Sequence, residues 1–165
     1  MNTTAVLLAR PERIGLAELQ LAEPTADDVV VDVHWSGIST GTERLLFTGR
    51  MPAFPGMGYP LVPGYESVGR VVQAGEASGM QVGQQVFVPG ANCFGPLDGQ
   101  PVRGLFGGSA SRLVVPGRRV IAVDEALGEQ AVLLALAATA YHAVSGGGRI
   151  AHPQAPQLIV GHGVL

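Results

Sequence analysis

Short hydrophobic runs separated by glycine and proline fill the first 123 residues of the chain. Residues 28–35 alternate in the pattern of a strand, and one of its two faces carries Val29, Val31, Val33 and Trp35. Similar runs predict further strands at residues 4–9, 67–73, 85–89, 111–115 and 120–123. Many short strands with no intervening helix are typical of an antiparallel barrel or sandwich. We therefore expect residues 1–123 to form one β domain.

The pattern changes after residue 123. Residues 126–144 contain no proline, are rich in alanine and leucine, and are followed by three glycines at 146–148, which predicts a helix. This helix is apolar all round, so we expect it to be covered on several sides. Residues 157–160 resemble a short aliphatic strand that leads into Gly161 and Gly163. A strand followed by Gly-x-Gly is typical of dinucleotide-binding folds, although an ordinary glycine turn has the same sequence. We expect a second domain to begin over residues 124–165.

Composition and charge exclude several classes of function. The net charge is −3, with 10 Lys and Arg among 165 residues, so we expect no surface for nucleic acid. The apolar run of residues 131–144 is shorter than the ~20 residues that cross a bilayer, and residues 1–10 lack the features of a signal peptide. The single cysteine, Cys93, permits no internal disulfide and no zinc site built from several thiolates. We expect a cytoplasmic protein without a transmembrane segment.

Three motifs carry a resemblance to a known family. Residues 37–43 read Gly-Ile-Ser-Thr-Gly-Thr-Glu, and residues 60–72 read Pro-Leu-Val-Pro-Gly-Tyr-Glu-Ser-Val-Gly-Arg-Val-Val. Together with Ala-Ala-Thr-Ala-Tyr-His-Ala at residues 137–143, they resemble the amino-terminal catalytic domain of medium-chain dehydrogenases. The resemblance implies a mainly β fold of the α+β class. A GroES-like β-barrel would be followed by a connecting helix and the first strand of an incomplete Rossmann domain.

Residues 35–44 and 54–67 narrow the resemblance to one branch of this family. They are similar to the members that oxidise the 3-(1-hydroxyethyl) side chain of a bacteriochlorophyllide to 3-acetyl, with NAD as hydride acceptor. The resemblance therefore implies a tetrapyrrole substrate from bacteriochlorophyll synthesis. It also implies a chain cut within its NAD-binding domain and inactive alone. The residue that selects NAD or NADP would lie ~20 positions after the glycine turn, beyond Leu165.

The metal ligands of zinc-dependent relatives are replaced in this sequence. Position by position, the resemblance puts Ser39 at one cysteine ligand, Tyr65 at the histidine ligand, and Ala135 near the other cysteine. Only Glu66 is kept, and one carboxylate does not make a zinc site. The lobe that binds a second zinc in many relatives needs four cysteines and contains only Cys93. We expect a zinc-free member of the family.

Without a metal, the hydroxyl proton of an alcohol has to leave through protein groups. Thr42 matches the hydroxyl residue that contacts the alcohol in zinc relatives, and Tyr65 beside Glu66 is a candidate acid or base. Ser39 and Thr40 are candidates for positioning the substrate hydroxyl. Structural roles stay open as well: Tyr65 would then pack in the barrel, and Glu66 would accept hydrogen bonds from backbone amides in a turn.

Residues 45–59 resemble an apolar loop that suits a large flat ligand. The candidate substrate-binding residues are His142 on the predicted helix and, in the loop, Phe47, Arg50, Phe54, Met57 and Tyr59. Arg44 and Arg50 are candidates to meet a propionate of the macrocycle. The loop has an alternative role, packing against a cofactor domain or against a second subunit of a homo-oligomer.

Cofactor contacts are predicted on the helix and in the glycine turn. Thr139 shares a helix face with His142, three residues away, and is assigned to the cofactor together with Gly161 and Gly163. A satisfied core histidine is the alternative role for His142.

Two other functions stay open at this stage. A zinc-free quinone or enoyl reductase would use the same scaffold without the alcohol-contacting role of Thr42. A non-enzymatic binding barrel, similar to a co-chaperonin subunit, fits the β domain but does not account for the added helix and Gly-x-Gly strand.

Overall fold

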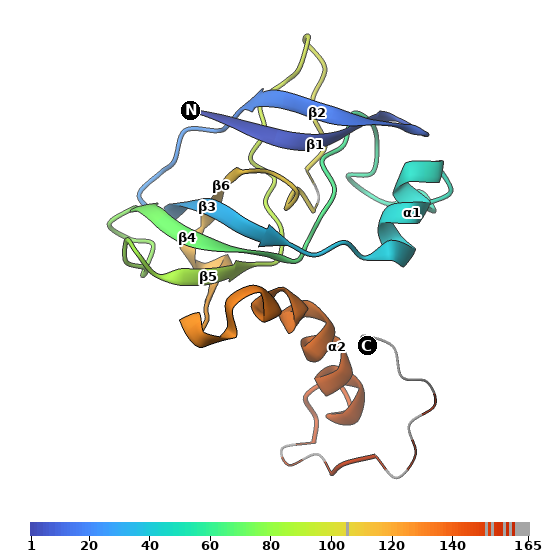
Figure 1. Cartoon of the computed structure of the whole chain (residues 1–165), viewed down its shortest axis with the longest axis vertical. Helices are drawn as coiled ribbons and strands as arrows, with labels where there is room; N and C mark the ends of the chain where they lie inside the picture. The colour runs from blue at the N-terminus through green and yellow to red at the C-terminus, as the bar shows by residue number, and fades with distance from the viewer. Residues whose placement is uncertain (105, 151, 153, 157, 159, 161–165) are drawn as a thin grey trace.

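The fold consists of two antiparallel sheets that enclose a common core. The computed structural model describes residues 1–104, 106–150, 152, 154–156, 158 and 160. Strands β1 (Asn2–Arg10) and β2 (Arg13–Gln20) form a hairpin. The second sheet has the order β6-β3-β4-β5-β7 and consists of β3 (Asp28–Ser36), β4 (Ser67–Ala74), β5 (Gln85–Val88), β6 (Arg112–Pro116) and β7 (Ile121–Ala122). Figure 1 shows the hairpin and this sheet on opposite sides of the barrel. The mainly β fold predicted from the sequence is confirmed.

Isolated bridges join the two sheets into one barrel. Ala5 in β1 pairs with Ala110 just before β6, and Leu8 in β1 pairs with Leu61. Strands β6 and β7 are the outer strands of the five-stranded sheet. The barrel is thus closed by these bridges and by side-chain packing, because its strands do not form one continuous ladder.

The alternation predicted for β3 is interrupted at His34. In the pairing with β4, the first register shift leaves Val72 of β4 as the extra residue, and the second leaves His34 of β3 as the extra residue. Val29, Val30 and Val31 are all fully buried, whereas Trp35 is 36% exposed. A bulge adds one residue to a strand and moves the following side chains to the other face. The prediction of one shared face ending at Trp35 was therefore wrong.

Helix α1 (Thr40–Thr48) follows β3 and was not predicted. It ends at Gly49, whose φ of 70° is left-handed. Leu46 of α1 is fully buried against Leu8 and Leu61. The apolar loop expected over residues 45–59 therefore starts only at Gly49, because residues 45–48 are helical, and the expectation of strands without an intervening helix was wrong. Burial of Leu46 stabilises a helix whose first residues, Thr-Gly-Thr, have low helix propensity. Strand β2 was also missed, because most of its residues are exposed and show no inward alternation.

The carboxyl-terminal helical region consists of two parts. The 3₁₀ segment η2 (Glu125–Leu133) contains a non-helical residue, Gly128, with φ 51° and ψ −130°, and helix α2 (Leu134–Val144) follows it. A single helix over residues 126–144 was therefore an overestimate. No residue within α2 is buried, so the expectation that this helix is covered on several sides was wrong. Figure 1 shows α2 projecting away from the barrel.

One helical stretch, Glu125–Val144, is long and apolar enough to cross a membrane by length and composition, with a mean hydropathy of 1.2 and 6% of it buried. Its continuous α-helical part, α2, has 11 residues, which rise about 17 Å at 1.5 Å per residue. This is well short of the ~30 Å of a bilayer core. The absence of a transmembrane segment stays a prediction.

The predicted second domain can be followed only in part. Strand β7 ends at Ala122 and η2 begins at Glu125, which brackets the predicted boundary between residues 123 and 124. Leu158 and Val160 are exposed and belong to no strand. The other residues of the predicted strand, 157 and 159, lie outside the described residues, as do the turn glycines Gly161 and Gly163. The division into two domains stays a prediction.

Candidate functional site

The chain turns at Gly37 after β3 and lies directly on Glu66. The Gly37 N–H donates to the Glu66 carbonyl oxygen at 2.7 Å. A Cβ at position 37 would lie 2.4 Å from Glu66 Oε2 and 3.0 Å from Glu66 Cβ, which is closer than side-chain atoms pack. Glycine at this position therefore allows residues 37–43 to contact the Glu66 side chain.

Three residues predicted to be catalytic, Ser39, Thr40 and Glu66, line one cavity of about 420 Å³. The remaining lining residues come from the same turn and from the helical region: Gly37, Ile38, Gly41, Val132, Leu133 and Leu136. The cavity thus lies between the barrel and the helical region. Its polar groups are on the barrel side and its apolar groups are on the helical side. An alcohol group could be oriented by the hydroxyls there.

Tyr65 and Thr42 meet at a separate place. Tyr65 Oη donates to Thr42 Oγ1 at 3.4 Å, a long hydrogen bond. The Tyr65 ring packs against Phe106, with ring centroids 5.3 Å apart. Thr42 also lines a surface cavity of about 620 Å³ together with Arg50. The five predicted catalytic residues therefore form two groups: Ser39, Thr40 and Glu66 in one, Tyr65 and Thr42 in the other.

Two carboxyl groups are held in the protein without a compensating partner. Glu66 is 4% exposed, and both its Oε1 and the Oε2 of Glu43 are buried with no hydrogen-bond partner among the described residues. Burial raises the pKa of Glu66. Burial also raises the pKa of Glu43 to about 7; the negative charge of Glu66 adds to this rise, and a backbone hydrogen bond at Ser39 opposes it. Both carboxyl groups thus lie in surroundings that favour the protonated form.

Glu43 is the candidate that the sequence reasoning missed. It belongs to the motif at residues 37–43, but no role was assigned to it. Its place is set by α1, where the Glu43 N–H donates to the Ser39 carbonyl oxygen at 2.9 Å. Residues three and four apart on a helix share a face, so Glu43 shares one with Leu46 and Phe47. A helix prediction over residues 40–48 would have placed Glu43 on the buried side of α1.

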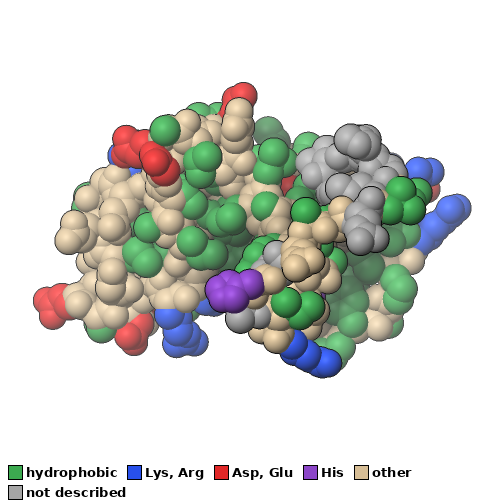
Figure 2. Space-filling view, turned by 90° about the horizontal axis from the view of Figure 1, so that it is seen from below, with side chains coloured by type: hydrophobic (Ala, Val, Ile, Leu, Met, Phe, Trp, Pro, Cys, Tyr) green, Lys and Arg blue, Asp and Glu red, His purple; other side chains and the backbone are tan. Residues whose placement is uncertain are grey.

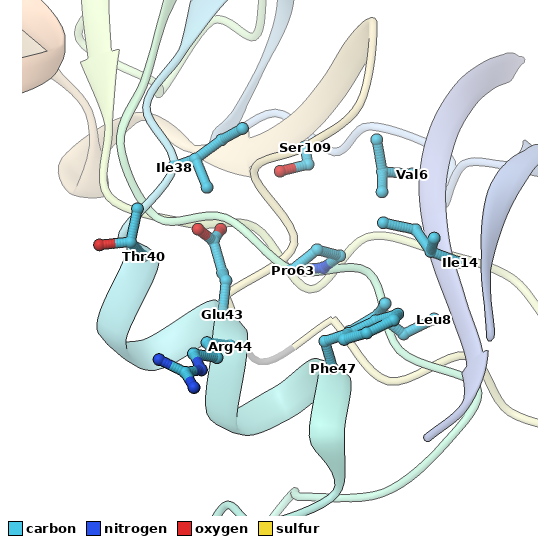
Figure 3. Close-up of a pocket in the computed structure, with 10 residues that line it drawn as sticks. All are labelled: Val6, Leu8, Ile14, Ile38, Thr40, Glu43, Arg44, Phe47, Pro63 and Ser109. Carbon is cyan, nitrogen blue, oxygen red and sulfur yellow. The ribbon is translucent and has the colours of Figure 1, made fainter. Parts of the chain in front are cut away.

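Glu43 projects into a second cavity of about 440 Å³ between α1 and the β1–β2 hairpin. The lining is mostly apolar and consists of Val6, Leu8, Ile14, Ile38, Thr40, Glu43, Arg44, Phe47, Pro63 and Ser109. Figure 3 shows the Glu43 carboxyl group pointing into the space below Ile38, with the Arg44 guanidinium turned away. Ile38 and Thr40 line both this cavity and the one that contains Glu66, so the two cavities adjoin.

The loop residues predicted to bind substrate do not gather at one place. Phe47 lines the 440 Å³ cavity, but Met57 and Tyr59 pack on the core beneath α1, where the Tyr59 hydroxyl donates to the Leu46 carbonyl oxygen. Phe54 is half-buried and Arg50 is exposed. Two of the five thus support the inner face of α1, and only Phe47 faces the apolar cavity.

The candidates on α2, His142 and Thr139, are both exposed. The Thr139 hydroxyl donates to the Ala135 carbonyl oxygen at 3.0 Å. Figure 2 views the molecule from this end and shows hydrophobic side chains over much of it, with charged side chains mainly at the margins. The roles predicted for His142 in substrate binding and for Thr139, Gly161 and Gly163 in cofactor binding stay predictions.

The residues that replace zinc ligands offer few metal-binding atoms. Within the described residues, no group of three or more His, Cys, Asp or Glu side chains is placed to hold a metal ion. Cys93 is buried, and burial raises the pKa of its thiol to about 11, which disfavours the thiolate that binds metals. The donor set thus does not fit a zinc site, and a zinc-free enzyme stays our prediction.

Comparison with known proteins assigns the family. Residues 25–125 match the alcohol dehydrogenase GroES-like domain. The chain belongs to this family. The GroES-like barrel and the medium-chain dehydrogenase resemblance inferred from the sequence are thereby confirmed.

Two relatives match this GroES-like chain over its whole length. It is 55% identical to the 2-desacetyl-2-hydroxyethyl bacteriochlorophyllide A dehydrogenase of Cereibacter sphaeroides, covering 51% of that protein. It is 52% identical to the protein of the same name from Rhodobacter capsulatus, covering 50% of it. The chain thus spans about half the length of these relatives.

A solved structure shares the fold. It is described as a short chain alcohol dehydrogenase from Escherichia coli complexed with the cofactor NADH. The two chains are 25% identical with a TM-score of 0.67, and the match covers 90% of this GroES-like chain and 46% of the other.

Proposed function

We propose that this chain is the substrate-binding and catalytic half of a dehydrogenase that oxidises the 3-(1-hydroxyethyl) group of a bacteriochlorophyllide to 3-acetyl, with NAD as hydride acceptor. The observation that carries the proposal is the 55% identity, over all 165 residues, to a bacteriochlorophyllide dehydrogenase. A cavity lined by hydroxyl and carboxyl groups beside an apolar one supports it. A flat macrocycle needs apolar walls, and its alcohol needs polar groups at one end.

The chemistry removes a hydride and a proton from one secondary alcohol. NAD, when bound, supplies the hydride acceptor. The residues of this chain bind the alcohol, exclude water and accept the hydroxyl proton. Ser39 and Thr40 orient the hydroxyl from one cavity wall, and the proton leaves through a nearby acid or base, for which Tyr65 with Thr42 and Glu66 are the candidates predicted from the sequence.

The macrocycle rests on the apolar walls. Phe47 is a direct contact in this proposal, because it lines the 440 Å³ cavity. Arg50, at the surface, is the partner for a propionate, while Phe54 and His142 border the ring. Met57 and Tyr59 act indirectly by supporting α1 from the core.

The experiment joins this chain to the carboxyl-terminal half of the Cereibacter sphaeroides relative and follows NADH formation with 3-(1-hydroxyethyl) bacteriochlorophyllide. We expect NAD-dependent turnover. Reduction of quinones or enoyl compounds, without oxidation of the bacteriochlorophyllide, would instead support the reductase alternative and contradict the proposal.

The variants Tyr65→Phe, Thr42→Val and Glu66→Gln then test the proton route. Loss of a proton-transfer group costs ~10²–10⁴-fold in kcat, with little change in KM where binding is unaffected. Turnover within a few-fold of the parent in all three variants would place the proton acceptor elsewhere in the site and leave the proposed reaction intact. Cytoplasmic location and homo-oligomer formation stay predictions that cell fractionation and light scattering of the fused protein can check.

A further inference from the structure

We propose that Glu43 accepts the proton of the substrate hydroxyl, and that Glu66 is a positioning residue that shares one proton with it. This inference rests on the proposed function and deepens it, because it names the atom that receives the proton. Neither the sequence motif nor the correspondence with zinc relatives assigned a role to Glu43.

The first support is the unpartnered oxygen of Glu43. Its Oε2 is buried and has no hydrogen-bond partner among the described residues, and the Glu43 side chain lines a cavity with room for a ligand. Buried polar atoms are nearly always hydrogen-bonded, so an exception requires an explanation. An alcohol hydroxyl bound in this cavity is a donor of the right kind. The apolar walls from β1, β2 and Phe47 would hold the remainder of such a substrate.

The second support is the neighbouring carboxyl group. Glu66 is 4% exposed and its Oε1 is unpartnered among the described residues. Gly37 leaves no side chain between Glu66 and the turn that leads into α1. The cavities that Glu43 and Glu66 line share Ile38 and Thr40, so the two side chains border the same turn. Neighbouring carboxyl groups in a desolvated place resist simultaneous ionisation, and we expect this pair to titrate as a unit and to retain one proton.

Among the described residues that line the Glu43 cavity, none directs a cation at the carboxyl group. On α1, Arg44 lines the Glu43 cavity, but its guanidinium is turned away. The cavity residues from the hairpin and from the segments before β4 and β6 are uncharged: Val6, Leu8, Ile14, Pro63 and Ser109. Burial raises the pKa of Glu43 to about 7, and the negative charge of Glu66 adds to this rise. A base is most effective when its pKa is near the working pH.

The step balances with NAD as the oxidant named in the proposed function. The carbinol C–H bond breaks, and its electron pair goes with the hydrogen to the nicotinamide ring as a hydride. The O–H bond breaks and its proton passes to the Glu43 carboxylate, while the C=O bond of the 3-acetyl group forms. Glu43 is only half-buried, so it can then release the proton to solvent. Tyr65 is less suited, because it lines neither of the two adjoining cavities.

Carboxyl titration of this chain by carbon-13 NMR tests the pair without any activity. We expect one glutamate resonance to titrate near neutral pH, to vanish in Glu43→Gln, and to move to lower pH in Glu66→Gln. The exposed Glu129→Gln is the matched control and should leave the curve unchanged. A Glu43 resonance that titrates like that of Glu129, and does not respond to Glu66→Gln, would overturn the inference.

Kinetics of the fused enzyme test the proton acceptor itself. We expect Glu43→Gln to lower kcat by ~10²–10⁴-fold and to abolish the rise of kcat with pH. Glu66→Gln should shift that rise to lower pH, and Glu43→Asp should recover part of the loss. Glu43→Gln with parental kcat and pH profile, beside an inactive Tyr65→Phe, would overturn this inference and leave the proposed function standing. A parent enzyme that does not oxidise the bacteriochlorophyllide would contradict the proposed function, while the NMR titration would still report on the pair.

Discussion

At the scale of single residues, environment decides what each carboxyl group in this protein does. Asp32 receives two hydrogen bonds from the Arg112 guanidinium, one of them at 2.9 Å, and this contact lowers the pKa of Asp32. Glu43 has the opposite surroundings: apolar walls, an acidic neighbour and an unpartnered oxygen. The contact with Arg112 stabilises the charged form of Asp32 at the surface, whereas the surroundings of Glu43 favour its protonated form. Only the surroundings of Glu43 suit a group that takes up a proton and releases it during turnover.

Glu43 should make the stability of the chain depend on pH. Its pKa is about 7 in the fold, against an ordinary value of 4.5, so the folded state binds more protons than the unfolded state between these two pH values. The stability from neutral Glu43 is fully present below pH ~4.5 and is lost as the pH rises through ~7. Glu43→Gln keeps the neutral form at every pH. We expect it to match the parent at low pH and to exceed it above pH ~7 by on the order of 2 kcal/mol, at about 1.4 kcal/mol per pKa unit less screening.

Urea unfolding at several pH values measures this difference. Glu129→Gln, on the exposed side of η2, is the control and should show no such trend. A Glu43→Gln curve parallel to that of the parent at all pH values would contradict the assignment of the raised pKa to this residue.

At the scale of elements, α1 and the turn before it organise the site. The turn at Gly37 brings the chain into contact with Glu66. Helix α1 then places Glu43 at the apolar cavity between α1 and the β1–β2 hairpin, and it packs on the core through Leu46. Two glycines on either side of Ser39 differ in their surroundings. A Cβ at Gly37 would collide with Glu66, whereas a Cβ at Gly41 would have nothing within 4 Å. The pair therefore separates the effect of close packing from the effect of removing a glycine.

We expect Gly37→Ala to destabilise the fold by on the order of 1–3 kcal/mol, because the buried Glu66 side chain has to shift. Gly41→Ala lies in the first turn of α1 and should be neutral or stabilising by up to ~1 kcal/mol. Thermal unfolding of both variants checks this. Equal stability of the two would mean that the contact of Gly37 with Glu66 does not constrain the site.

At the scale of the whole molecule, the barrel is well packed and the helical end is open. The main core lies between the two sheets, while α2 has no buried residue and shows exposed apolar side chains such as Tyr141 and Val144. The chain also spans about half the length of its relatives. We infer that the second half of the enzyme, where present, supplies most of the cofactor site.

Weak NAD binding by the 165-residue chain follows from this division. Among the described residues, Thr139 is the predicted cofactor contact, and its hydroxyl already donates to Ala135. Pyrophosphate binding requires a helix amino terminus after the glycine turn. We expect calorimetry to show no micromolar affinity for NAD in this chain and clear binding in the fused protein. Micromolar binding by the chain alone would contradict the expectation.

Zinc content is a second property of the whole molecule. Ser39, Tyr65 and Ala135 stand where zinc relatives have ligands, and two glutamates alone bind zinc poorly. We expect elemental analysis after dialysis against a chelator to give far less than one zinc per chain, with the fold unchanged by circular dichroism. Close to one zinc per chain would show that other donors complete a site.

Local patterns in the sequence determined the family, the barrel and most of its strands. Alternation with period two, glycine spacing and the identity of residues at motif positions are properties of short segments. They predicted β1 and β3 to β7, and the replaced zinc-ligand positions led to the prediction of a zinc-free enzyme. Tertiary structure alone decided that residues 40–48 form a helix, because Leu46 is buried against Leu8 and Leu61, which are far away in the chain. It also decided that Glu43 and Glu66 line adjoining cavities and that Tyr65 contacts Thr42. The pKa of a carboxyl group depends on burial and on charges brought close by folding, and no pattern along the chain contains that information.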